Sequence, residues 1–431
     1  MSDILFLAVR SVWHRRIPTI LTMLSISLSV ALFVGVEKTK DATRDAFSGA
    51  ISRVDLIVGP RTGSLSLLLY SVFHVGSPTH NVSMKSVEYA RSRPEVNWVV
   101  PFSLGDGFRG FPVVGTTPDF FERYKYRDGY SISLSTGHVF AGDSDVVVGS
   151  AVAQTLGLHL GDRVVLSHGH TEDGDGFEKH EDHPFELVGI IAPTGSPLDK
   201  SVYVSLVGLG EIHRGLGGIG EHDGDEGDSD KHHDDHGSFE EKDGKLVVTS
   251  VSGFFLGAKN RMDSLNLQRT INTYDGDALL AILPGMAMGE LWKNLSMFET
   301  ALSVVSFFVV VAGVLGLFVS LYIISGQRQR EMMVLRAVGA GPSAIFALLA
   351  GEALCLVAGG VVLGSGVMYI GMNILKPWIE TKFSVNLNVS GIKSQDLIFA
   401  GCLLMVGCLV GVLSSVKAYR SAMHDGLGTK F

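Results

Sequence analysis

Cysteine is nearly absent from this chain, which has Cys355, Cys402 and Cys408 among 431 residues. All three lie in long apolar stretches, and the region 37–298 has none. That region therefore forms no disulfide, and a core of ordinary apolar packing has to stabilise it. We interpret the three cysteines as small apolar packing residues.

Nucleotide-binding and catalytic motifs are also missing. The chain has no G-x-x-x-x-G-K-[ST] loop, because Asp243-Gly-Lys245-Leu lacks both the hydroxyl and the spacing that would hold phosphates. It has no H-E-x-x-H, no C-x-x-C and no evident nucleophile–base arrangement. We therefore expect that the chain does not hydrolyse ATP by itself, and an enzyme acting alone is the weakest functional class.

Long apolar runs are present instead. Four of them, at about 20 residues or more, are long enough to cross a bilayer as helices. They cover 17–36, 300–325, 343–375 and 397–416, and Glu352 is the one acidic residue inside them. The first run lacks a signal-peptidase site, so we expect it to be retained. The fold class is an integral membrane protein of four transmembrane α-helices in a one-plus-three arrangement, with a large mixed α/β domain inserted between the first and second.

Basic residues predict the orientation. They precede the first run, lie between the second and third, and follow the fourth, at Arg10, Arg15, Arg16, Arg328, Arg330, Arg336, Lys417 and Arg420. By the positive-inside rule these parts face the cytoplasm. The cytoplasmic parts are then the amphipathic helix 1–16, the segment 326–342 and the tail 417–431. The domain 37–298 and the short loop 376–396 then lie outside.

The exported domain is predicted to contain short strands and helices. Residues 37–50 continue the first membrane helix, and 54–60 form a strand that ends at a Gly-Pro turn. Thr117 caps a helix with Pro118 at its first position. Residues 145–158 form a strand that turns into a helix, and 161–166 pair with 185–191 as a hairpin.

Two inserts in this domain, 167–184 and 220–237, are rich in histidine, Asp, Glu and Gly. Their histidines are His168, His170, His180, His183, His222, His232, His233 and His236. Imidazoles and carboxylates bind Zn²⁺, so we interpret the inserts as flexible zinc-binding segments. Solvated loops with an incidental composition are the alternative, and no fixed spacing indicates a catalytic zinc centre. Binding by histidine weakens in acid.

The segment Gln329-Arg-Glu-Met-Met-Val-Leu-Arg-Ala-Val-Gly-Ala340, followed by Glu352, closely resembles the signature of the MacB/FtsX-like ABC transporter permeases. Leu7–Thr22 resembles the family's N-terminal helix and first span. Val113–Phe121 and Val147–Asp162 resemble its core-domain motifs. The tail departs from the family pattern at Ser415–Arg420, and the histidine inserts lie outside that pattern.

The resemblance implies a complex of two permease chains, a homodimer, with a dimer of cytoplasmic ABC ATPase subunits that alone bind ATP. It also implies mechanotransmission, in which closure of the ATPases is relayed through the helices to the exported domains. The residues expected to dock on the ATPase are Arg328, Arg330, Glu331, Leu335, Arg336 and Gly339. A topogenic loop that touches only lipid headgroups is the alternative for this segment.

Glu352 is expected to face the bundle interior, hydrogen-bonded to Ser or Thr of neighbouring helices, and a proton relay is the less favoured role. Two small-x-x-x-small pairs, Gly360 with Gly364 and Gly407 with Gly411, permit close helix packing. That packing could lie within one chain or across a dimer.

These features favour a permease that couples ATP hydrolysis to periplasmic work linked to zinc or another metal. Release of lipoproteins, or export of peptides or small molecules, is an alternative within that class. A signalling scaffold that controls a periplasmic partner is a different class. The fold requires no cofactor. Membrane lipids and a periplasmic metal-binding or accessory protein are the other expected partners, and nucleic acid is not one.

Overall fold

The computed structural model describes residues 16–168, 183–214, 239–242, 245–260, 262–327, 334, 341–383 and 394–424. The chain divides into two compact units. One comprises 1–43, 296–378 and 388–431, and the other comprises 44–295 and 379–387. We call them the four-helix unit and the sheet domain.

The four-helix unit is built from α2 (Arg16–Ser48), α9 (Pro284–Gln327), α11 (Pro342–Phe383) and α12 (Ser394–His424). Each contains a stretch long and apolar enough to cross a membrane, at Ile17–Asp45, Pro284–Ile323, Ala350–Lys376 and Asp396–Leu413. Many large apolar side chains on these helices are exposed in the chain alone, as lipid-facing residues are in membrane proteins. The prediction of four apolar helices is confirmed.

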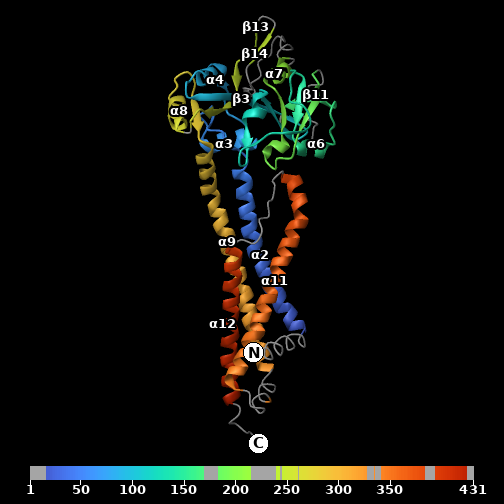
Figure 1. The fold of residues 1–431 in the computed structure, drawn as a ribbon, viewed down its shortest axis with the longest axis vertical. Coiled ribbons are helices and arrows are strands. Elements are labelled where there is room, and N and C mark those ends of the chain that lie inside the picture. Colours follow the sequence, from blue (N-terminus) through green and yellow to red (C-terminus); the bar gives the residue numbers. More distant parts are fainter. Residues whose placement is uncertain are drawn as a thin grey trace, which may run out of the picture. The chain divides into compact units, whose positions relative to one another are not determined.

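The four helices run alongside one another (Figure 1) and share one apolar core. Ile26 and Val30 of α2 pack in it with Leu317 of α9, Leu356 of α11 and Leu403 of α12. The ring of Phe33 in α2 stacks on that of Phe399 in α12, with centroids 4.0 Å apart. Helix α2 therefore contacts the other helices along much of its length.

The helices of the sheet domain are α3 (Ser64–Phe73), α4 (Met84–Arg91), α5 (Asp119–Arg123), α6 (Ser150–Leu156), α7 (Leu206–Arg214), α8 (Asp263–Asn272) and the 3₁₀ helix η1 (Pro197–Lys200). The strands of its main sheet are β1 (Leu56–Pro60), β3 (Val96–Phe108), β4 (Phe111–Thr116), β7 (Leu134–Gly137), β8 (Asp145–Val148), β9 (Arg163–Val164), β10 (Ser167–His168), β11 (Phe185–Ile191), β12 (Val202–Ser205), β16 (Gly253–Ala258) and β17 (Leu279–Ile282). Three two-stranded ladders pair β2 (Val82–Ser83) with β15 (Ser250–Val251), β5 (Lys125–Tyr126) with β6 (Tyr130–Ser131), and β13 (Phe239–Lys242) with β14 (Lys245–Val248).

The main sheet is mixed, with the order β17-β1-β16-β3-β4-β12-β8-β11-β7. Strand β12 pairs with β4, and β11 with β8, in parallel, while the other pairs are antiparallel. Strand β10 pairs with β3, and β9 with β11. A mixed α/β domain is therefore confirmed.

Alternation along the strands gives the sheet two apolar faces. Ile57 of β1 and Tyr203 of β12 belong to the core on one face, with side chains of α3 and α5. Their neighbours Leu56, Val58 and Val204 belong to the cores of the opposite face, which α4, α6, α7 and α8 help to form. Helices therefore cover both faces of the sheet.

Two local expectations are wrong. Gly59 and Pro60 are not a turn but end β1, where they pair with β17. Pro60, which has no N–H to donate, fits at the end of β1 because β16 pairs with the other side of β1 only as far as Val58. Glycine is required at Gly59 because a Cβ there would meet the hydroxyl of Tyr70. Helix α5 begins after Pro118, and no side-chain cap from Thr117 forms.

The strand-to-helix turn at 145–158 is confirmed. The predicted hairpin of 161–166 with 185–191 is confirmed only in part, because β9 is limited to Arg163–Val164 and pairs with the start of β11, whereas the rest of β11 pairs with β8 and β7. Helix α2 continues past its apolar run to Ser48, also as expected. Helix α9 begins at Pro284, well before the apolar run at 300–325 that predicted it.

Candidate functional site

The predicted ATPase-docking residues Arg328, Arg330, Glu331, Leu335, Arg336 and Gly339 lie outside the described residues. The structure describes the two helices on either side of this segment. Helix α9 ends at Gln327 and α11 begins at Pro342, so the segment for which docking is predicted connects two helices of the same bundle.

Glu352 lies in the interior of the four-helix unit, with 2 % of its surface exposed. It follows the first turns of α11 and is adjacent to the fully buried Ala353. Glu352 interacts with neighbouring groups. The position agrees with the expectation that this group faces the interior, while a Ser or Thr partner stays a prediction.

A polar seam joins α2 to α9, and sequence reasoning missed it. The hydroxyls of Thr22 and Ser320 share a hydrogen bond of 2.7 Å, and Ser29 Oγ donates to the carbonyl of Val309 at 3.1 Å. Gly313 lies opposite Ser29, whose hydroxyl would be 2.5 Å from a Cβ there. Interhelical hydrogen bonds and small residues hold membrane helices together where apolar burial gives little drive.

Helix α11 packs on α2 through its glycines. A Cβ at Gly360 would lie 2.6 Å from Ile26, and one at Gly364 would lie 2.5 Å from the carbonyl oxygen of Ser27. A Cβ at Gly407 of α12 would lie 2.5 Å from Val357 of α11. Of the two arrangements left open by the sequence, these glycines therefore take the one within a chain.

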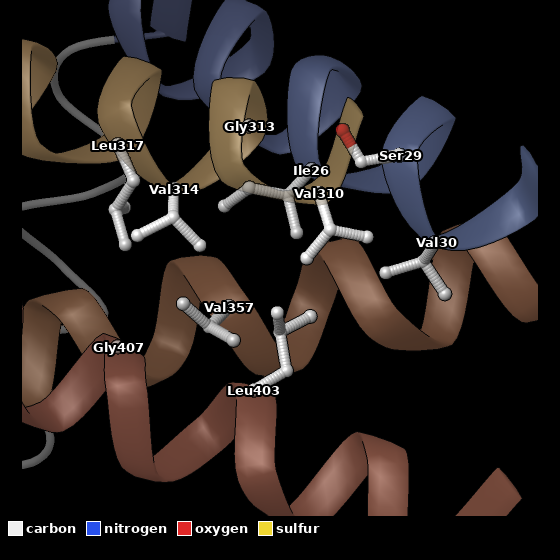
Figure 2. Close-up of a pocket in the computed structure, with 10 residues that line it drawn as sticks. All are labelled: Ile26, Ser29, Val30, Val310, Gly313, Val314, Leu317, Val357, Leu403 and Gly407. Carbon is white, nitrogen blue, oxygen red and sulfur yellow. The ribbon is translucent and has the colours of Figure 1, made fainter. Parts of the chain in front are cut away.

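Figure 2 shows where the four helices meet. Side chains from all four surround a cavity of about 10 Å³, which is about the size of one water molecule. Its lining is apolar apart from Ser29, and the residues are Ile26, Ser29, Val30, Val310, Gly313, Val314, Leu317, Val357, Leu403 and Gly407. This cavity is too small to admit a substrate.

Both α2 and α9 enter the sheet domain as continuous helices. Their ends there meet at Trp292 of α9, whose ring lies 5.9 Å from that of Phe47 and 5.4 Å from the guanidinium carbon of Arg44. Met288 and Leu291 of α9 are buried in the same apolar core as the sheet residues Ile57 and Tyr203. These contacts fix the two helix ends to the domain core.

Most of the predicted metal ligands lie outside the described residues. His168 lies in β10, opposite Asp106 of β3, and His183 is exposed just before β11. The other six, His170, His180, His222, His232, His233 and His236, lie outside the described residues. Among the residues that the structure describes, no three His, Cys, Asp or Glu side chains gather closely enough to hold a metal ion.

Two polar groups of the sheet domain have structural roles. Tyr124 is buried and donates to the carbonyl of Ala50 at 3.0 Å, and burial raises the pKa of its hydroxyl far above the ordinary value. Partial burial disfavours ionisation of Asp277, but hydrogen bonds from Ser83 and Ser86 outweigh it and lower its pKa. Both anchor neighbouring segments.

Comparison with known proteins agrees with this architecture. Residues 19–222 match the MacB-like periplasmic core domain, and residues 303–425 match the FtsX-like permease C-terminal domain. No curated protein sequence matches the chain closely.

Two solved structures are similar to part of the chain. The periplasmic region of MacB from Actinobacillus actinomycetemcomitans is 10% identical, with a TM-score of 0.33, and the match covers 56% of this chain and 94% of that one. The extracellular domain of the noncanonic ABC-type transporter YknZ from Gram-positive bacteria is 12% identical, with a TM-score of 0.27, and the match covers 53% and 98%.

Four apolar helices and a mixed α/β domain, together with the two matched domain families, define a permease subunit of an ABC transporter. More particularly, the chain belongs to the MacB/FtsX-like permeases. It is therefore an inner-membrane protein with a periplasmic domain, and its family implies a cytoplasmic ABC ATPase as partner.

Proposed function

We propose that this permease relays ATP-driven closure of its ATPase to the periplasmic domain by mechanotransmission. In this proposal the complex contains two identical permease chains, each with both termini in the cytoplasm. Each chain crosses the membrane once before the periplasmic domain and three times after it. One observation above all supports the proposal. Helices α2 and α9 each run without a break from the four-helix unit into the sheet domain, where Met288 and Leu291 lie in the domain core.

A helix transmits displacement along its axis because each turn is hydrogen-bonded to the next. The polar seam at Thr22, Ser29 and Ser320 holds α2 and α9 together, so the two move as a pair. The water-sized cavity of Figure 2 also favours a relay over a conduit, because the space where the described parts of the four helices meet is too small for a cargo.

At the cytoplasmic end we assign the docking role to Arg328, Arg330, Glu331, Leu335, Arg336 and Gly339. Arginine forks and a carboxylate give directional contacts that resist sliding under load. Replacing Arg330, Glu331 and Arg336 with Ala should weaken co-purification of the ATPase. The matched change, Lys417 and Arg420 to Ala, removes basic residues from the C-terminal tail and should leave it intact.

The experiment that tests the relay interrupts α9. Met297 lies inside α9 and is 75 % exposed, so proline there breaks the helix without opening the core. The complex, reconstituted in nanodiscs, is compared by hydrogen–deuterium exchange with and without ATP. We expect Met297→Pro to keep ATPase activity but to lose the ATP-dependent change in α3 and β1, and Met297→Ala to keep both. If Met297→Pro keeps the change in the sheet domain, the relay does not run through α9.

We further propose that the histidine inserts bind Zn²⁺ and link the transport cycle to it. Their composition supports this: neutral imidazoles and carboxylates are zinc ligands, and eight histidines lie within the two inserts. Replacing the eight with Asn should abolish zinc retention by the purified full chain and alter growth in limiting or excess zinc. The control variant carries His80→Asn and His159→Asn. Equal zinc content and unchanged growth would contradict the zinc link and leave the force relay standing.

A further inference from the structure

A second cavity lies between α2 and α12 in the four-helix unit, and the force relay does not use it. Its volume is about 330 Å³, the space of roughly ten water molecules. The residues of α2 that line it are Phe33, Val34, Glu37, Lys38 and Asp41, and those of α12 are Asp396, Ile398 and Phe399.

The lining changes from apolar to charged in the same direction on both helices. On α2 the apolar residues Phe33 and Val34 end the long apolar run, and Glu37 and Asp41 follow one and two turns later. On α12, which runs the opposite way, Asp396 comes first, and Ile398 and Phe399 follow towards the apolar run. The cavity therefore has an apolar end and a charged end.

The charged end is mainly negative. It contains three carboxylates, those of Glu37, Asp41 and Asp396, and one ammonium, that of Lys38. Lys38 is 2 % exposed and lies 2.7 Å from Asp396. Glu37 also forms an ion pair of 3.2 Å with Lys40, which does not line the cavity. With Lys40 included, the three carboxylates still outnumber the two ammonium groups, so a further positive charge placed here would be attracted by carboxylates close to apolar surroundings, where charges are weakly screened.

A metal ion does not fit this place, because among the described residues no three metal-ligating side chains gather closely enough. The apolar end, with the stacked rings of Phe33 and Phe399, is suited to a hydrocarbon chain. We propose that this cavity binds an amphiphile with a primary ammonium head, held by Glu37 and Asp41, and an apolar chain laid against Phe33 and Phe399.

Two sources share this chemistry: a membrane lipid with an ethanolamine head, and a free long-chain amine. The binding test needs no ATP and no ATPase, so its result is separable from that of the relay. The full chain is placed in phosphatidylcholine nanodiscs with a photoreactive long-chain primary amine, and labelling of peptides that contain Phe33 or Phe399 is measured by mass spectrometry. A photoreactive alcohol with the same chain is the reference probe.

We expect the amine to label these peptides more than the alcohol does. The double variant Glu37→Gln, Asp41→Asn should lower amine labelling about fivefold, whereas Asp45→Asn, which removes a carboxylate outside the cavity on the same helix, should not. Lys38→Met should raise it, because that change removes the resident ammonium that competes for the carboxylates. A variant that merely misfolds would lower labelling, so the opposite directions separate binding from damage.

Replacing phosphatidylcholine with phosphatidylethanolamine identifies the source. Loss of labelling means that the membrane lipid occupies the cavity, and unchanged labelling means that a free amphiphile is the ligand. Equal labelling by amine and alcohol, or equal labelling of the double variant and Asp45→Asn, would overturn the proposal.

Discussion

Lys38 of α2 and Asp396 of α12 form an ion pair of 2.7 Å. Lys38 follows the apolar run of α2, and Asp396 precedes that of α12. The end of one span and the start of another therefore lie at the same level of the bundle.

Removing one partner of this ion pair should cost more stability than removing the other. Asp396→Asn removes the carboxylate that lies 2.7 Å from the buried ammonium of Lys38 and should cost about 3 kcal/mol. Lys38→Met should cost less, because Asp396 is 19 % exposed and keeps contact with solvent. Thermal unfolding of the detergent-purified chain measures both. The exchanged pair Lys38→Asp with Asp396→Lys should recover part of the loss, and no recovery would show that the pair contributes little.

The glycine contact between α2 and α11 gives a second prediction. Gly364→Leu would force a side chain against the backbone of Ser27 and should separate the helices, with loss of folded protein from the membrane fraction. Gly366, two residues away on α11, has open space where its Cβ would be, so Gly366→Leu is the matched control. Equal tolerance of both variants would contradict the packing described here.

The lowered pKa of Asp277 predicts a pH dependence. A carboxyl whose pKa is lower in the folded state stabilises that state above its unfolded pKa of about 4, and this stabilisation is lost as pH falls further. The protection of α4 amides against hydrogen exchange, corrected for the intrinsic pH dependence of exchange, should therefore fall in acid more steeply in the wild type than in Asp277→Asn. The exposed Asp275 provides the control. Parallel pH profiles for wild type and Asp277→Asn would be inconsistent with an ionised anchor.

Tyr124 should contribute measurably to the sheet domain. Tyr124→Phe leaves the ring in place but removes the hydrogen bond that the hydroxyl donates to the carbonyl of Ala50. This loss should lower the free energy of unfolding by about 1 kcal/mol. The effect should appear as faster exchange around residues 49–53. Tyr130 is 60 % exposed, so Tyr130→Phe should change nothing there.

Much of the membrane part was predictable because its signal is local. A run such as 17–36 needs only length and hydropathy to indicate a spanning helix. The start of α9 was missed because residues 284–299 are less apolar, although Ala287, Met288 and Leu291 already have the spacing of a one-sided helix. The hydropathy window gives this amphipathic part too little weight.

The sheet order was beyond the sequence. Nothing local places β16 between β1 and β3, because that order arises from packing between segments about 150 to 200 residues apart. The Lys38–Asp396 pair is hidden for the same reason. The polar seam was within reach: Thr22 and Ser29 lie seven residues apart on one helix face, as do Gly313 and Ser320. The docking segment and most of the histidines stay predictions.

The central claim is that ATP binding in the cytoplasm moves the periplasmic domain. The sheet domain has no cysteine, so a label on Leu265→Cys, with Cys355, Cys402 and Cys408 replaced by Ala, reports its position alone. Leu265 lies on α8 and is 62 % exposed. Double electron–electron resonance between the spin labels on the two permease chains of the proposed complex should give different distance distributions with and without ATP. Identical distributions, in a complex that hydrolyses ATP, would contradict the account.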